Sequence, residues 1–186
     1  MSGLRPAVSE IDHRAGPAAA PVTLVEYGDY ECPHCGRAQP IVEEIRKRMG
    51  SRLAFVFRHF PLASVHPHAE HAAQAAEAAA SQGRFWEMHA AIFADQAALT
   101  DLDLVRRAQR LGLDAGRLGH ELAGGVHAGR VRRDFESGVR SGVNGTPTFF
   151  VNGVRHDGPW DVESLLAALQ AAAEFARPAV HVRGAR

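Results

Sequence analysis

The chain has 186 residues, with 21 basic and 21 acidic side chains and a formal net charge of zero. At about 150 residues per domain, this length predicts little more than one domain, large enough to fold without a metal ion or a disulfide. The balance of charge argues against nucleic-acid binding, which needs a basic face. An apolar content of 46% is ordinary for a globular protein and points to no further class.

The sequence contains no apolar run as long as the ~20 residues that a membrane span requires. The first 20 residues include the charged side chains Glu10, Asp12 and Arg14 and lack the apolar core of a signal peptide. We therefore expect a chain without a membrane span that stays in the cytoplasm. A periplasmic or extracytoplasmic location is the alternative if a leader has been removed.

The two cysteines, Cys32 and Cys35, are separated by only two residues. A disulfide between them would close too short a loop to add much stability. A structural zinc site usually takes four ligands, from two such pairs or from a pair and histidines. Neither structural role suits this pair, so redox chemistry is the leading interpretation.

The first third of the chain predicts a strand, a helix and a second strand. Residues 1–20 contain prolines and a glycine and predict an irregular surface tail. The β-rich runs Val22–Tyr27 and Leu53–Phe60 predict buried strands. Between them, apolar residues recur at helical spacing from His34 to Met49, with a kink expected at Pro40. If the two strands are parallel, the cysteines lie at the carboxyl end of the first strand, where α/β proteins place their sites.

The rest of the chain predicts a helical block followed by a hairpin and a final helix. Five helices are expected: about His68–Gln82, Phe85–Ala94, one capped by Thr100 and ending at Gly112, a short one after Asp114, and Val126–Val139. Asn152-Gly153 predicts a hairpin turn between the strands Thr148–Val151 and Val154–His156, and a last helix is expected between Asp161 and Pro178.

This order of elements predicts an α/β protein with a thioredoxin-like fold and an inserted all-helical domain. The expected divisions are an N-terminal tail over residues 1–20, the two parts of the thioredoxin-like domain over 21–62 and 143–176, the helical insertion over 63–142, and a C-terminal tail over 177–186.

The stretch Glu26–Cys35 reads EYGDYECPHC and ends in Cys-Pro-His-Cys. Together with Thr146-Pro147 further along the chain, it resembles the active site of DsbA-like thiol–disulfide oxidoreductases, which are thioredoxin-fold proteins with an inserted helical domain. The resemblance covers about residues 12–175. The segments VHPHA and GTPTFFVNG make it most similar to a bacterial subgroup, in which some members are secreted or lipid-anchored and some are fused to Na⁺/H⁺ antiporters.

The resemblance implies an enzyme without a cofactor, in which Cys32 attacks and Cys35 resolves the mixed disulfide. At a helix N-terminus, free N–H groups and the helix dipole favour the Cys32 thiolate. His34, which follows Pro33, is expected to add a hydrogen-bond donor or a positive charge to that thiolate. We interpret the chain as a disulfide donor. A cytoplasmic thioredoxin-like reductase or isomerase is the alternative within enzymes, and a metal- or partner-binding module is the alternative outside them.

In the family, the proline at the position of Pro147 is cis and packs against the cysteines. A cis bond would present the backbone of Thr146 to an extended client chain, whereas a trans proline starting an edge strand is the alternative. Glu26 is expected to be a buried acid that relays a proton to or from Cys35, and the alternative is a glutamate that reaches solvent. Glu31 is expected to be exposed.

Two further groups of side chains are open to two interpretations. A metal site is possible at the histidine group His59, His66, His68 and His71, but surface or capping roles are the stronger expectation, so we predict no metal site. The stripe Phe85, Trp86, Met88, Ile92 and Phe93 is expected to form the core of the insertion rather than a client groove. Expected partners are protein or peptide thiols and disulfides and a redox protein that recycles the cysteines. We expect a monomer.

Overall fold

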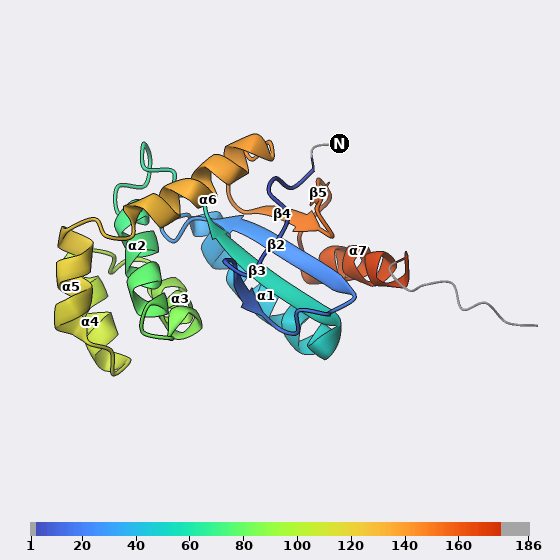
Figure 1. The fold of residues 1–186 in the computed structure, drawn as a ribbon. Helices are drawn as coiled ribbons and strands as arrows, with labels where there is room; N and C mark the ends of the chain where they lie inside the picture. The colour runs from blue at the N-terminus through green and yellow to red at the C-terminus, as the bar shows by residue number, and fades with distance from the viewer. Residues whose placement is uncertain (1–2, 176–186) are drawn as a thin grey trace, which may run out of the picture.

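A five-stranded sheet with the order β1-β3-β2-β4-β5 organises the computed structural model, which describes residues 3–175 (Figure 1). The strands are β1 (His13–Ala15), β2 (Val22–Gly28), β3 (Leu53–His59), β4 (Thr148–Val151) and β5 (Val154–His156). β2 and β3 run parallel, and the other neighbouring pairs are antiparallel. The parallel pair requires a crossover, which helix α1 (Pro33–Met49) supplies as the sequence predicts.

Five helices lie between β3 and β4, and one follows β5. They are α2 (Ala69–Ala80), α3 (Phe85–Phe93), α4 (Asp101–Arg110), α5 (Ala115–Ala123), α6 (Ala128–Arg140) and α7 (Val162–Phe175). The predicted cap of α4 is present, because Thr100 and Asp103 form a reciprocal capping box. Pro178, which is predicted to end the last helix, and the predicted tail 177–186 lie outside the described residues.

The N-terminal segment departs from the prediction of an irregular tail. It contains β1, which pairs with β3 at one edge of the sheet. Buried Arg58 holds the segment in place, because its guanidinium donates to both carboxylate oxygens of Asp12 at 2.7 and 3.1 Å and to the carbonyls of Pro6 and Ala7. A three-residue strand is too short to show a period-two pattern, so sequence reasoning missed it.

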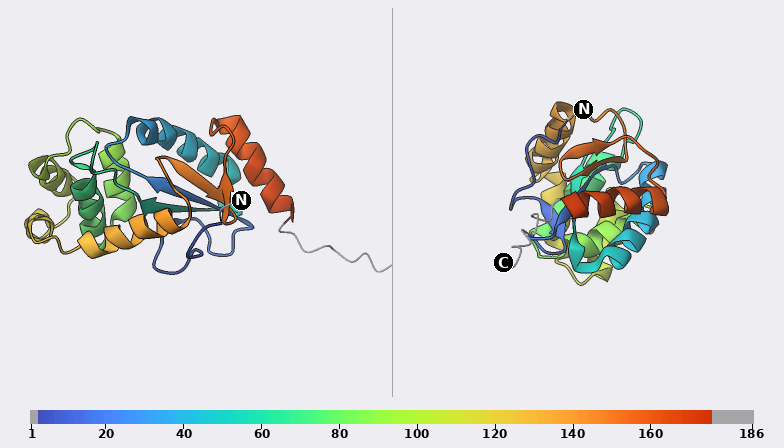
Figure 2. Two further views of the ribbon diagram at one scale, coloured as in Figure 1. Left: turned by 90° about the horizontal axis from the view of Figure 1, so that it is seen from above. Right: turned by 90° about the vertical axis from the view of Figure 1, so that its right-hand side faces the viewer.

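Alternate residues of the central strands face two separate cores. Leu24 of β2 faces the side covered by α1 and α7, whereas its neighbour Val25 faces the side on which Phe135 of α6 packs. Figure 2 shows α1 and α7 on one side of the sheet and α6 on the other. Burial on both faces explains why β2 and β3 are nearly continuous apolar runs.

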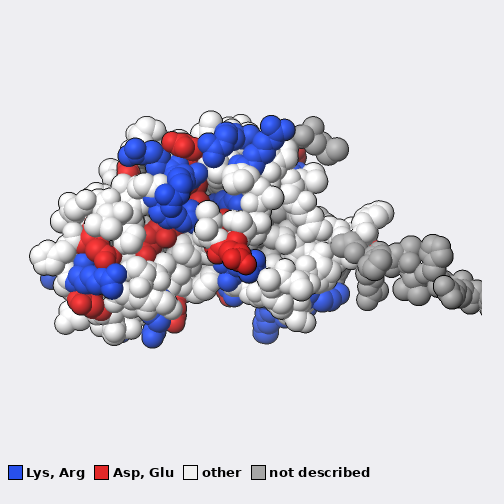
Figure 3. Space-filling model, viewed as in Figure 1, with Lys and Arg blue, Asp and Glu red and all other residues white. Residues whose placement is uncertain are grey.

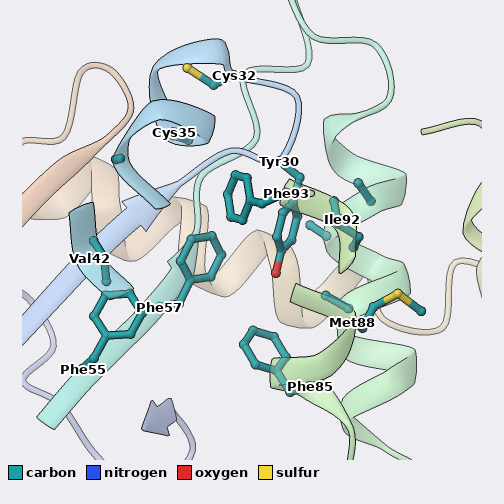
Figure 4. Close-up of a cluster of buried hydrophobic side chains, with 14 of the residues drawn as sticks. Tyr30, Cys32, Cys35, Val42, Phe55, Phe57, Phe85, Met88, Ile92 and Phe93 are labelled. Atoms are coloured by element: carbon teal, nitrogen blue, oxygen red, sulfur yellow. The ribbon is translucent and has the colours of Figure 1, made fainter. Parts of the chain in front are cut away.

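The larger core continues from the sheet into the helical block. The ring of Tyr30 lies 5.4 Å from that of Phe57 and 4.9 Å from that of Phe93. Figure 4 shows these rings together, with Cys32 at the edge of the cluster on the first turn of α1. The predicted stripe of the insertion is core: Phe85, Met88, Ile92 and Phe93 are buried, and half-buried Trp86 packs against them. One core therefore joins the sheet to the helices beside the cysteines.

The surface carries charges of both signs. On the face shown in Figure 3, acidic and basic side chains are interspersed, with basic side chains densest over α6. Among the described helices, none is both long and apolar enough to cross a membrane.

Candidate active site

The two cysteines lie where β2 ends and α1 begins. Cys32 is the N-cap residue of α1 and Pro33 is its first residue, a position that suits proline because its missing N–H would have no helical partner. Cys35 lies one turn further on and is fully buried, whereas 4% of Cys32 is exposed. Both carry free thiols. The structure thus places the pair at the carboxyl end of a parallel strand, as the sequence predicts.

Asp29 fixes the conformation of the loop between β2 and Cys32. Its Oδ1 accepts hydrogen bonds from the backbone N–H groups of Glu31 at 2.8 Å and of Cys32 at 3.2 Å. Its own backbone N–H donates to Cys35 Sγ at 3.4 Å. Sequence reasoning did not assign Asp29 a role at the site. An aspartate that bonds the backbone two residues on is a known turn pattern and was the available signal.

The surroundings of the two thiols push their pKa values apart. The hydrogen bond from Cys35 is the largest influence on Cys32, and burial opposes it. The nearby Thr146 hydroxyl and the backbone N–H groups of Cys35 and His34 also favour the charged form, and the pKa of Cys32 falls to about 5. Burial above all raises the pKa of Cys35 far above its ordinary value. At neutral pH, Cys32 is therefore a thiolate and Cys35 a thiol.

His34 contributes to the site differently from the expectation. Its side chain is exposed, and its Nδ1 accepts a hydrogen bond from Nη2 of Arg37 at 2.8 Å. The group of His34 that lowers the pKa of Cys32 is the backbone N–H. The expected imidazole donor to the thiolate is therefore not present in this arrangement, because the ring is bonded to Arg37.

Thr146 and Pro147 lie opposite Cys32, and the peptide bond between them is cis. When Cys32 is protonated, its Sγ donates a hydrogen bond to the carbonyl of Thr146 at 3.4 Å. Its Oγ1 is buried and has no hydrogen-bond partner within residues 3–175. This hydroxyl is thus available to the Cys32 thiolate, whose pKa it lowers.

Glu26 lies near the end of β2 and is 1% exposed, so its side chain does not reach solvent. Its Oε2 finds no hydrogen-bond partner in the described part of the chain. Burial, and then the negative charge of Cys32, raise the pKa of Glu26 to about 8. Its charge in turn contributes to the raised pKa of Cys35. A carboxyl group with this pKa gains and loses protons near neutral pH.

The four histidines singled out in the sequence do not converge on one point. Each pairs with a different carboxylate: His59 with Glu77, His66 with Asp29, His68 with Glu31 and His71 with Asp101. Glu31 is therefore half-buried and paired rather than exposed as expected.

A different trio, His13, His59 and Glu77, is the one group with metal-ligand spacing among the described residues. Nε2 of His13 and Nε2 of His59 lie 2.7 and 2.8 Å from the same Glu77 oxygen, so that oxygen already occupies the centre of the group. Nε of Arg130 lies 3.8 Å from it and would repel a cation. The arrangement is that of a hydrogen-bonded cluster.

Gln96, between α3 and α4, connects the inserted helices to the loop between β2 and Cys32, which we call the catalytic loop. Its Nε2 donates to the carbonyls of Tyr30 at 2.8 Å and Cys32 at 3.0 Å. A Cβ at residue 36 would collide with the Gln96 side chain, so Gly36 makes room for this contact. Nothing in the local sequence indicates a contact across more than 60 residues, and sequence reasoning missed it.

The family model for thioredoxin matches residues 9–171. The chain belongs to the thioredoxin family. Residues 9–171 include both cysteines, Thr146 and Pro147, so the match spans the whole candidate site.

Several solved structures share the fold of this chain. The chain is similar to oxidised BdbD from Bacillus subtilis, with a TM-score of 0.81, 24% identity and coverage of 88% of this chain and 93% of that one. For a thioredoxin-like oxidoreductase from Silicibacter pomeroyi DSS-3, the TM-score is 0.79 and the identity is 26%. The match covers 89% of this chain and 94% of that one. For Wolbachia pipientis α-DsbA1, the TM-score is 0.78 and the identity is 20%, and the match covers 91% of this chain and 94% of that one. The expected DsbA-like fold with inserted helices is confirmed.

Curated relatives are longer than this chain. It is 52% identical over 166 residues to the Na⁺/H⁺ antiporter NhaA 3 of Salinispora tropica, a match that covers 89% of this chain and 25% of the relative. A Na⁺/H⁺ antiporter NhaA 1 from Mycobacterium sp. (strain KMS) is 48% identical, with coverage of 90% and 28%. The chain thus spans about a quarter of the length of the curated relatives it matches.

Proposed function

We propose that the chain is a disulfide donor, which transfers the oxidised Cys32–Cys35 bond to protein or peptide dithiols. The observation that carries the proposal is the unequal placement of the two sulfurs. Cys32 lies at a helix N-terminus among hydrogen-bond donors, and Cys35 is fully buried behind it. Such a site stabilises the reduced pair with one thiolate and one thiol, which makes the disulfide a good oxidant.

The reaction has two exchanges. A client thiolate attacks Cys32 Sγ of the disulfide, and Cys35 leaves and takes a proton. A second client thiolate then attacks the client sulfur of the mixed disulfide, which forms the client disulfide and releases Cys32 as a thiolate. Its pKa of about 5 makes Cys32 the better leaving group. Glu26, with a pKa of about 8, is the proton donor that we assign to Cys35.

Client binding is assigned to the face around Thr146 and Pro147. The Thr146 carbonyl oxygen lies 3.4 Å from Cys32 Sγ, so a client backbone beside it would bring its own sulfur close to Cys32. Extended peptides bind in this way by adding to exposed backbone groups.

The pKa of Cys32 sets the expected oxidising strength. A fall from ~7, as in thioredoxin, to about 5 stabilises the reduced form at pH 7 by roughly 2 kcal/mol. This corresponds to roughly 50 mV above thioredoxin, part of the way toward DsbA. A donor needs an oxidising compartment, so the proposal favours the extracytoplasmic location and requires a partner that reoxidises the cysteines.

The proposal is tested by equilibrating the protein in glutathione buffers and by oxidising a reduced dithiol peptide. The expected potential lies above that of thioredoxin, and a value near −270 mV would favour the reductase alternative. Cys32→Ser is expected to abolish disulfide transfer. Cys35→Ser, its matched control, keeps the attacking sulfur, and when the peptide is supplied in its disulfide form this variant should accumulate a mixed disulfide with it. Disulfide transfer by the Cys32→Ser variant would contradict the proposal.

A further inference from the structure

Two histidine–carboxylate pairs join the segment between β3 and α2 to the catalytic loop. Nδ1 of His66 lies 2.7 Å from Oδ2 of Asp29, and Nδ1 of His68 lies 3.1 Å from Oε1 of Glu31. The two acids flank Tyr30, immediately before Cys32. Two imidazoles are thus hydrogen-bonded to the catalytic loop, and neither has a role in the donor reaction described above.

Of the two pairs, the one formed by His66 is the more buried and the more directly connected to Cys32. The Asp29 side chain is fully buried, and its Oδ2 accepts bonds from His66 and from the backbone N–H of Leu62 at 2.8 Å. Its Oδ1 accepts from the N–H of Cys32 at 3.2 Å. One carboxylate therefore connects the imidazole of His66 to the backbone of the reacting residue. His68 lies further out, with 45% of its side chain exposed against 18% for His66.

The charges that act on His66 come from the catalytic loop. Burial lowers the pKa of His66, but the hydrogen bond and charge of Asp29, followed by the charges of Cys32 and Glu31, outweigh it and raise the pKa. The charge of Cys32 exists only while the cysteines are reduced, whereas Asp29 and Glu31 are present in both states. Reduction thus adds one negative charge to the surroundings of an imidazole that is already held in place.

We propose that His66, held by the buried carboxylate of Asp29, takes up the second proton that a client dithiol loses when it reduces the Cys32–Cys35 disulfide. This inference rests on the proposed donor function. The client gives up two electrons and two protons as its own S–S bond forms and the enzyme's S–S bond breaks. One proton goes to Cys35. The other, which a Cys32 thiolate does not take, goes to the imidazole of His66. Asp29 is a positioning residue, and His66 stabilises the thiolate without touching the client.

The proposal is tested directly by following the His66 ring through pH titrations with nitrogen NMR. The pKa of His66 is expected to be higher in the reduced protein than in the oxidised protein. It is also expected to be higher in the reduced wild type than in Cys32→Ser, which has no thiolate in either state. Equal His66 pKa values in all three proteins would overturn the proposal.

The Cys32→Ser comparison separates this inference from the donor function, because it needs no disulfide exchange. If the His66 pKa follows the thiolate but the dithiol peptide is not oxidised, the donor function fails and the proton coupling stands. If the peptide is oxidised and the His66 pKa does not move, only the coupling fails.

A second measurement uses the glutathione equilibrium between pH 6 and 7.5, in a Glu26→Gln background so that Glu26 cannot hold the proton instead. In His66→Gln, one proton is released per reduction, and the equilibrium constant should rise about tenfold per pH unit. With His66 present the rise should be smaller, because the imidazole retains that proton. His68→Gln is the matched control and should show the same pH dependence as its parent. A tenfold rise per pH unit with His66 present would overturn the proposal.

Discussion

Glu26 and Glu77 are both buried glutamates, with exposures of 1% and 6%, but their surroundings shift their pKa values in opposite directions. Burial raises the pKa of Glu26 to about 8, and its Oε2 receives no hydrogen bond from residues 3–175. Burial acts on Glu77 too, but hydrogen bonds from His13 and His59 outweigh it and hold the pKa well below its usual range. The comparison shows that hydrogen-bond partners, rather than burial alone, decide whether an interior carboxyl group stays charged.

The two glutamates also occupy different parts of the molecule. Glu26 lies near the end of β2, beside the cysteines, where a group that exchanges protons is useful. Glu77 lies in the middle of α2 and joins that helix to β1 through His13 and to β3 through His59. We therefore expect substitution of Glu77 to affect stability and substitution of Glu26 to affect chemistry.

The largest loss of stability is expected for Glu77→Gln. Loss of the charge that holds two histidines and faces Arg130 should lower the free energy of unfolding by about 3 kcal/mol, measured by urea denaturation at pH 7. The folded-state pKa of Glu77 is lowered, so its contribution is complete above the ordinary carboxyl pKa and is lost as the pH falls below it.

Exposed Glu43→Gln, on the outer face of α1, is a control for loss of a glutamate charge and should change stability little. Equal stability of the Glu77→Gln protein and the wild type would mean that the histidine–carboxylate cluster is not a structural connection. Once folded, the Glu77→Gln protein should oxidise the dithiol peptide at the wild-type rate.

Glu26→Gln is expected to act on stability in the opposite direction, because it removes a penalty that depends on pH. The raised pKa means that the folded protein keeps a proton that the unfolded chain loses above about pH 4.3. The free-energy cost of keeping Glu26 protonated in the folded protein therefore grows with pH from about pH 4.3 and reaches its limit near pH 8. Relative to Glu26→Gln, the wild type should lose about 1.4 kcal/mol of stability per pH unit across this window.

Cys32 acts in the opposite sense in the reduced protein, because its lowered pKa adds stability as the pH rises above about 5. The measurement is therefore the difference between wild type and Glu26→Gln at each pH, by urea denaturation of the reduced proteins. Client oxidation by Glu26→Gln should also slow roughly tenfold at pH 7. A stability difference that stays constant from pH 5 to 8 would show that Glu26 does not titrate there.

The smallest effect is expected for Thr146→Val. The substitution keeps the shape of the side chain but removes the hydroxyl that lowers the pKa of Cys32. The pKa of Cys32 should rise by roughly half a unit, as measured by the ultraviolet absorbance of the thiolate, and the reduction potential should fall with it. Thr148→Val is the matched control, because that hydroxyl donates to the Gly145 carbonyl at 2.7 Å. Identical Cys32 pKa values in the two variants would rule out a role for the Thr146 hydroxyl.

The main helices and four of the five strands could be predicted because their signals are local. The caps at Thr100, Asp114 and Asp161 and the hairpin turn at Asn152 all act within three or four residues, and the structure contains each of them. The placement of Cys32 at a helix N-terminus follows from the same local reading.

The parts that sequence reasoning missed depend on contacts between distant residues. Gln96 reaches the carbonyl of Cys32 across 64 residues, and His66 reaches Asp29 across 37. The four histidines were close together in sequence, but the fold directs each to its own carboxylate. The imidazole of His34 turned to Arg37, a choice of side-chain rotamer that the Cys-Pro-His-Cys pattern does not determine.

The sheet ends on both sides in a strand of only three residues, β1 beside β3 and β5 beside β4. The backbone of Gly3 forms a further bridge to Val154 on the outer side of β5. Under the proposed donor function the protein would meet extended client chains, and a long open edge would recruit those chains into growing β-aggregates. Edge strands of three residues offer an incoming segment few backbone groups with which to pair. Contacts with extended polypeptides can therefore remain transient.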